Sequence, residues 1–141
     1  MRARFLVGGL LLVFAGCGRT NMAPVSGRVT LDDKPLARAT VVFQPASEGK
    51  NPGPGSAGKT DDNGQFTLQL MTSNVQGAVP GKHKVSITAY EGGDEVPSSG
   101  SRAVFRKALV PLKYNAETEL TFEVPPQGTN GAHFDLKTSP Q

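Results

Sequence analysis

The chain of 141 residues contains one cysteine, Cys17, and no tryptophan. A single cysteine excludes an intrachain disulfide. It also excludes zinc sites built from four cysteines, or from two cysteines and two histidines. The fold must therefore depend on an ordinary apolar core. A mature chain of roughly 120 residues is long enough to bury about two-thirds of its unfolded surface in one domain.

Clusters of positive charge are also missing, since no run of basic residues exceeds Arg106-Lys107. The formal net charge of +3 includes Arg2 and Arg4, which lie in a segment that we expect to be removed. Without them, 13 of the 15 lysines and arginines remain against 12 acidic residues, a net charge of +1. Nucleic-acid binding normally requires a clustered basic face, so no nucleic-acid partner is expected.

The chain has no apolar run long enough for a transmembrane helix, which needs about 20 residues. Its longest apolar run, Phe5–Ala15, has 11 residues. Arg2 and Arg4 precede this run. The small residue Ala15 ends the run, and Gly16 follows it directly. A positive start, a short apolar stretch and small residues are the order of a secretory signal peptide, which predicts removal of residues 1–16.

The tetrapeptide Phe14-Ala15-Gly16-Cys17 resembles the bacterial lipobox, with Phe14 in place of the usual leucine. The resemblance implies lipidation of the Cys17 thiol, cleavage before Cys17, and acylation (palmitate) of the new amino group. Two or more acyl chains give stable membrane anchoring. Residues 17–24 would form the tether, and Gly18 favours the outer over the inner membrane of a Gram-negative cell. The alternative is ordinary cleavage nearby with a free thiol at Cys17.

From Val25 onward, apolar and polar residues alternate with a period of two, which is typical of strands with one buried face. Six such segments are visible, and turn or loop sequences separate them: 25–31, 39–45, 66–70, 85–89, 120–124 and 134–136. Several short strands joined by turns predict an antiparallel sandwich over residues 25–138. The alternation assigns a core to Val41, Phe43, Phe66, Leu68, Val85, Ile87, Leu120 and Phe122.

Turn chemistry is strongest at Asp32–Pro35 and Asp61–Gly64, where Asn and Gly tolerate positive φ. Residues 46–58 and 91–111 read as loops because they are polar and rich in glycine, proline or serine over much of their length. A short helix competes with an extended conformation between Ala103 and Leu112, and we favour the extended one.

Three motifs together resemble the carboxypeptidase regulatory-like, or transthyretin-like, family of β-sandwich domains. They are Val25-Ser26-Gly27-Arg28-Val29 with the following segment 33–43, Thr60–Phe66, and Pro80–Ile87. The resemblance covers about half of the chain, residues 25–89. It implies a single seven-stranded, antiparallel, immunoglobulin-like sandwich after the signal peptide, and it implies no activity.

Enzymatic chemistry finds little support. Two tyrosines and two histidines match the ligand count of intradiol dioxygenases, but that family pairs its histidines closely, whereas His83 and His133 are 50 residues apart. Both histidines read as solvated. The purine-pathway hydrolase related to transthyretin needs a Tyr-Arg-Gly-Ser terminus, and this chain ends in Lys137–Gln141. Position 70, where a calcium-binding EF-hand would need glutamate, is Leu70. We therefore expect no enzyme, no metal site and no cofactor.

The sequence thus predicts a membrane-anchored, non-catalytic structural or protein-interaction module of the cell envelope. The alternative is a lipoprotein that binds a small ligand or a carbohydrate. Its exposed aromatic platforms would be Tyr90, Phe105 and Tyr114. The long loop of residues 91–111 is the predicted contact surface, through Arg102, Phe105, Arg106 and Lys107.

Overall fold

The computed structural model of the chain describes residues 21–46, 53–93 and 106–139. The predicted signal peptide, Cys17, Arg102 and Phe105 lie outside these ranges. Within them, no helix combines the length and apolar character needed to cross a bilayer. The described chain is all-β, apart from one short 3₁₀ helix, η1, at Leu112–Tyr114.

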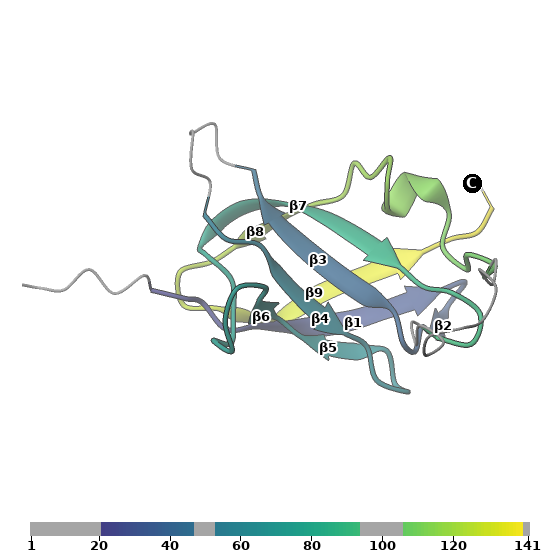
Figure 1. Cartoon of the computed structure of the whole chain (residues 1–141), viewed down its shortest axis with the longest axis horizontal. Coiled ribbons are helices and arrows are strands. Elements are labelled where there is room, and N and C mark those ends of the chain that lie inside the picture. The colour runs from purple at the N-terminus through teal and green to yellow at the C-terminus, as the bar shows by residue number, and fades with distance from the viewer. Residues whose placement is uncertain (1–20, 47–52, 94–105, 140–141) are drawn as a thin grey trace, which may run out of the picture.

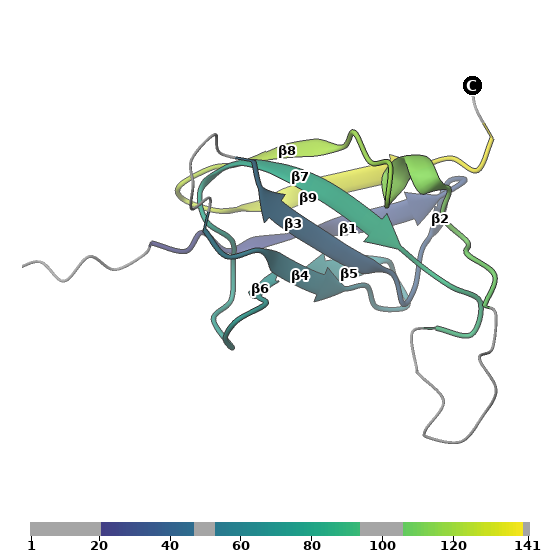
Figure 2. The ribbon, with the colours of Figure 1, turned by 45° about the horizontal axis from the view of Figure 1, so that its top comes forward.

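The strands form two facing sheets (Figures 1 and 2). In the first sheet, β1 lies between β9 on one side and β2 and β5 on the other; in the second, the order is β6-β4-β3-β7-β8. The strands are β1 Val25–Leu31, β2 Lys34–Pro35, β3 Thr40–Pro45, β4 Ser56–Lys59, β5 Gln65–Thr67, β6 Gln69–Leu70, β7 Gly81–Thr88, β8 Thr121–Val124 and β9 Thr129–Leu136.

The pairing differs from the predicted, wholly antiparallel arrangement at one point. β1 and β9 run parallel, with Gly27 beside Ala132 and Leu31 beside Leu136. A parallel pair needs a long connection, and here almost the whole domain lies between the two strands. No local turn signal marks such a pair, so the alternation of residues could not reveal it. β1 therefore begins and β9 ends at opposite ends of the sandwich (Figure 1).

The core lies between the sheets and follows the predicted alternation. Six of the eight predicted core residues are at most 3% exposed, whereas Leu120 and Phe122 are only partly buried against the core. These two are less covered because β8 is the edge strand of its sheet. Phe43 is the centre of an aromatic cluster, with ring centroids 5.6 Å from Phe122, 6.0 Å from Phe134 and 5.7 Å from His83.

Two segments depart from their predicted boundaries. The loop predicted for residues 46–58 ends early, because Ser56–Lys59 is β4 and pairs with β3. The segment 66–70 is not one strand: β5 belongs to the first sheet and β6 to the second. The fully buried Leu68 lies between them. The chain changes sheets there without losing its alternation, which is why the sequence pattern does not show the break.

The predicted turns are confirmed. Asp32 and Asp33 have φ values of 49° and 67° in the β1–β2 hairpin. At the second turn, the Asp61 carboxylate accepts hydrogen bonds from the N–H groups of Asn63 and Gln65, both at 2.9 Å. Asp61 thus holds the connection between β4 and β5. Residues 106–111 form a mixed loop without an α-helix, with one bridge residue at Ala108 and η1 beginning at Leu112.

The prediction that His83 is solvated is wrong. It is 1% exposed and shares the inward face of β7 with Val85 and Ile87. Its Nδ1 lies 3.0 Å from the carbonyl oxygen of Gly81, and its buried Nε2 has no hydrogen-bond partner. The contact with a carbonyl assigns a proton to Nδ1. A second proton on Nε2 would be buried without an acceptor, which favours the neutral ring. Burial lowers the pKa of His83, against smaller opposing effects of the Gly81 bond and Glu123.

His83 should make the domain sensitive to mild acid. Above about pH 6.5 the ring is neutral in both the folded and the unfolded state. As the pH falls below this value, the unfolded state takes up a proton that the folded state resists, so stability is lost by up to about 1.4 kcal/mol per pH unit. His83→Leu should flatten urea-unfolding free energies between pH 7.5 and 5, and His133→Gln serves as the control. An equally steep dependence in His83→Leu would assign the effect elsewhere.

The C-terminal segment is fastened to the turn after β1. The Asp32 carboxylate accepts hydrogen bonds from the Thr138 hydroxyl at 2.7 Å and the Thr138 N–H at 3.0 Å. These bonds, the hydroxyl bond first, lower the pKa of Asp32. Lys137 forms an ion pair of 2.6 Å with Asp33, which raises the pKa of Lys137. The C-terminal ends of β1 and β9 are thus fastened together at this end of the sandwich.

Candidate interaction surfaces

The outer side of the first sheet is a continuous polar surface, here called the β1 face. It arises because residues that alternate with the core residues of β1, β5 and β9 point to solvent. The parallel register then places the outward residues of β1 beside those of β9, with Arg28 beside His133 and Thr30 beside Asp135. The β1 face comprises Ser26, Arg28, Thr30, Gln65, Thr67, His133 and Asp135.

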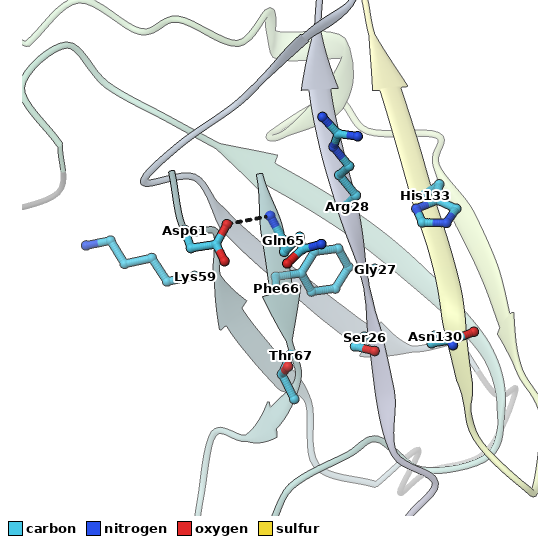
Figure 3. Close-up of a pocket in the computed structure, with 10 residues that line it drawn as sticks. All are labelled: Ser26, Gly27, Arg28, Lys59, Asp61, Gln65, Phe66, Thr67, Asn130 and His133. Carbon is cyan, nitrogen blue, oxygen red and sulfur yellow. Dashed lines mark hydrogen bonds between the residues drawn. The ribbon is translucent and has the colours of Figure 1, made fainter. Parts of the chain in front are cut away.

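An open depression of about 780 Å³ lies on this face. Its lining comes from β1, β5, β9, the end of β4 and the turn before β5, and it includes the β1-face residues Ser26, Arg28, Gln65, Thr67 and His133. In Figure 3, Arg28 and His133 project from neighbouring strands, with Gln65 across from them on β5. Phe66 is the one aromatic ring of the lining other than His133, and it is 3% exposed. The depression therefore offers polar groups and no open aromatic platform.

Charges of both signs lie close together on the β1 face. Arg28 donates from Nε to the carbonyl oxygen of Asn63 at 3.2 Å, which holds its side chain against the turn before β5. The Thr30 hydroxyl donates to Asp135 at 2.6 Å. These bonds orient the charged groups without neutralising them. Such a face can make many directional hydrogen bonds to another polar surface.

The described residues show no further chemical centre. No group of three or more His, Cys, Asp or Glu residues in the described ranges is arranged to hold a metal ion. His83 lies on β7 of the second sheet and is buried in the core. His133 lies on β9 of the first sheet and is exposed on the β1 face. The two histidines therefore do not meet in one site.

The predicted contact loop is only partly described, because Arg102 and Phe105 lie outside the described ranges. Arg106 donates a hydrogen bond to the carbonyl oxygen of Gly93, and Lys107 forms an ion pair of 3.4 Å with Glu91. Tyr90 also bridges to Ala108. The base of the loop is therefore a short antiparallel ladder. Arg106 closes that base, whereas the side chain of Lys107 is 76% exposed and remains accessible.

The predicted aromatic platforms do not form a groove in the described chain. Tyr90 is 39% exposed beside the loop base. Tyr114 is partly buried against the core, and its hydroxyl accepts a hydrogen bond of 3.2 Å from the N–H of Lys137. Tyr114 thus has a structural contact, while Phe105 lies outside the described residues.

Comparisons with known proteins give no family for this chain. No protein-family model matches it, and no curated protein matches it. Among solved structures, a 9R-lipoxygenase from Cyanothece is similar with a TM-score of 0.39 and 13% identity, over 83% of this chain and 16% of the lipoxygenase. A likeness this distant carries no argument about fold or function, which therefore have to be inferred from the chain itself.

Proposed function

We propose that this chain is a membrane-anchored, non-catalytic interaction module of the cell envelope. The observation that carries the proposal is the β1 face: a rigid sheet presents polar and charged side chains over an open depression, without an exposed aromatic platform. Surfaces of this kind suit a polar protein partner better than a sugar, which aromatic rings commonly hold. A carbohydrate-binding function is therefore the weaker alternative.

The anchoring part of the proposal is supported by the way the chain enters the domain. Ala23 lies six residues after Cys17 and is fully buried. It exchanges two backbone hydrogen bonds of 2.9 Å with Ala78. Only a few residues therefore separate the proposed lipid from the folded domain. The sandwich would be held close to the membrane by the end at which β1 begins.

The fold part of the proposal is a carboxypeptidase regulatory-like, immunoglobulin-like sandwich. Seven of the nine strands in the described chain have three or more residues. The remaining two, β2 and β6, are two-residue strands at sheet edges. This distribution supports the seven-stranded interpretation of the sequence motifs. Modules of this architecture place recognition on loops and open faces while the strands keep these in place.

Intact mass of the membrane fraction should show acyl chains on a protein that begins at Cys17. The physical reason is that a single short tether needs at least two acyl chains for lasting attachment. Cys17→Ser should move the protein to the soluble fraction or leave it as uncleaved precursor. A wild-type mature protein without acyl mass would contradict anchoring and leave the question of binding open.

The partner should contact the β1 face. A photoactivatable amino acid at Gln65 or Thr67, which are exposed on β5, should crosslink to an envelope protein in living cells. The matched control is Gln44, which is exposed on β3 in the opposite sheet. A third position, Lys107, tests the predicted contact loop. All positions are exposed, so differences in yield report on contacts rather than on folding.

The pattern of crosslinks identifies the surface that contacts the partner. A defined adduct from β5 that is absent from Gln44 supports the β1 face, and an adduct from Lys107 alone moves recognition to the loop of residues 91–111. Adducts that are equal at all three places would indicate collisions without a docking surface. Crosslinks to glycan strands instead of protein would favour the carbohydrate-binding alternative.

A further inference from the structure

We infer that the free edge of β9 pairs two copies of this chain, antiparallel and centred on Phe134. The inference goes beyond the proposed partner binding, and it does not depend on lipid anchoring. It rests on the backbone groups that β9 leaves open, on the register in which two such edges fit together, and on the side chains that would then meet.

The orientation of the β9 backbone follows from its pairing with β1. Within the described chain, β1 is the one strand that pairs with β9. Leu136 accepts a hydrogen bond of 2.9 Å from the N–H of Asp32, so its carbonyl points toward β1. Backbone groups alternate sides along a strand. From Ala132 to Leu136 the register with β1 is regular, so the backbone groups of His133 and Asp135 point to the free edge.

The ends of this edge are already occupied. At one end, the N–H of Gly131 donates to the hydroxyl of Thr129 at 3.0 Å. At the other end, the N–H of Lys137 donates to the hydroxyl of Tyr114 at 3.2 Å. Between these caps, the N–H and C=O groups of His133 and Asp135 make no hydrogen bond to the described residues. The open stretch of the edge is therefore short and sharply bounded.

A second copy fits this stretch in one symmetric register. In an antiparallel pair, two residues that face each other exchange both of their N–H···O bonds. If His133 faces Asp135 of the partner copy, two-fold symmetry places Asp135 opposite the partner copy's His133. The four open groups of each copy are then all used. The two Phe134 residues lie on the symmetry axis as the pair that does not exchange hydrogen bonds.

The same register also places hydrogen-bonding side chains opposite each other. His133 and Asp135 both point to the solvent side of the sheet. Directly opposed side chains are close enough to interact, and an imidazole N–H can donate a hydrogen bond to a carboxylate. The symmetric register creates two imidazole–carboxylate pairs. Thr129–Leu136 also contains no lysine and no proline, two residues that commonly protect an edge.

The other edges in the described chain are less suited to pairing. β8 has four residues, half as many as β9. β5 has three residues and β6 two. β9 offers eight residues, most of them in regular register with β1. A second copy is therefore expected at β9.

Disulfide trapping in the full chain tests the register. With His133→Cys and Asp135→Cys together, each new thiol faces a thiol of the other copy within disulfide range, and mild oxidation should give a covalent dimer. Either substitution alone places the nearest thiols diagonally, roughly 7–8 Å apart between Cβ atoms, which is beyond that range. Gln65→Cys with Thr67→Cys on β5 is the matched control, and the unsubstituted chain measures the background from Cys17.

A dimer from the β9 double variant that is absent from both single variants and from the β5 control supports the inference. Equal trapping in a single variant, no trapping at all, or a covalent adduct with a different protein would overturn it. Circular dichroism of each variant confirms that the domain is folded.

Charge variants test the same pairing without a covalent bond. His133→Asp places a carboxylate opposite Asp135 of the other copy, while His133→Lys places an ammonium group there. By sedimentation in mild detergent, His133→Asp should weaken self-association by about tenfold relative to His133→Lys, given two exposed pairs per dimer. Equal association of the two variants, or none in the wild type, would contradict pairing at this edge.

Discussion

Phe43→Ala should lower the free energy of unfolding by about 3–5 kcal/mol, the largest effect expected of any single truncation in this domain. The ring of Phe43 is fully buried and lies within 6.0 Å, between centroids, of the rings of Phe122 and Phe134. Its removal leaves a cavity where the two sheets meet. Neighbouring rings cannot fill it without moving β8 and β9 together.

Urea unfolding followed by far-UV circular dichroism measures this loss. Leu112→Ala is the control, because Leu112 is a large apolar residue that is 59% exposed. Its replacement should change stability by less than about 0.5 kcal/mol. A loss below about 1 kcal/mol for Phe43→Ala would mean that the two sheets do not pack around this ring.

Gly27→Ala should be nearly as damaging, although it adds only one methyl group. A Cβ at position 27 would lie 1.9 Å from the carbonyl oxygen of Ala132, which belongs to the β9 backbone. A backbone carbonyl in a sheet cannot turn aside, so β1 and β9 would have to separate. Overpacking of a core commonly costs about 1–3 kcal/mol, and the strand pairing lost here adds to that.

Gly131→Ala is the matched control for this substitution. Gly131 is exposed on β9, and the nearest atom to its added Cβ would be the Thr129 hydroxyl oxygen at 3.5 Å, an ordinary contact. Near-neutral stability is expected for it under the same urea titration. If Gly27→Ala were equally neutral, the close approach of β1 and β9 at this point would be wrong.

The sequence predicted the parts of the fold that depend on local alternation and turn residues. The segments around Val29, Phe43 and Ile87 are strands with the expected face inward. Contacts between distant segments were not predictable in the same way. The residues from Gln65 to Leu70 keep one alternation while they cross from one sheet to the other, and nothing in that pattern marks the crossing.

The two histidines also show that alternation within one strand does not predict contacts between strands. His83 is in phase with Val85 and Ile87, so the alternation itself placed it inward, but the flanking Lys82 and Lys84 suggested solvent. The β1 face was missed for a different reason. Ser26 and Arg28 were recognisably outward, yet their proximity to His133 depends on a parallel pairing over about 105 residues. Sequence reasoning found the faces of single strands but not the surface that the strands form together.

The parallel pairing of the first and last strands also sets how the domain carries mechanical load. Force applied between the two chain ends pulls β1 and β9 in opposite directions along their own length, because the chain enters and leaves at opposite ends of the sandwich. The hydrogen bonds between Gly27–Leu31 and Ala132–Leu136 are then strained in shear and have to break together, whereas an antiparallel hairpin pulled at its open end would unzip one bond at a time. A domain tethered at one end and held at the other would therefore transmit tension without unfolding.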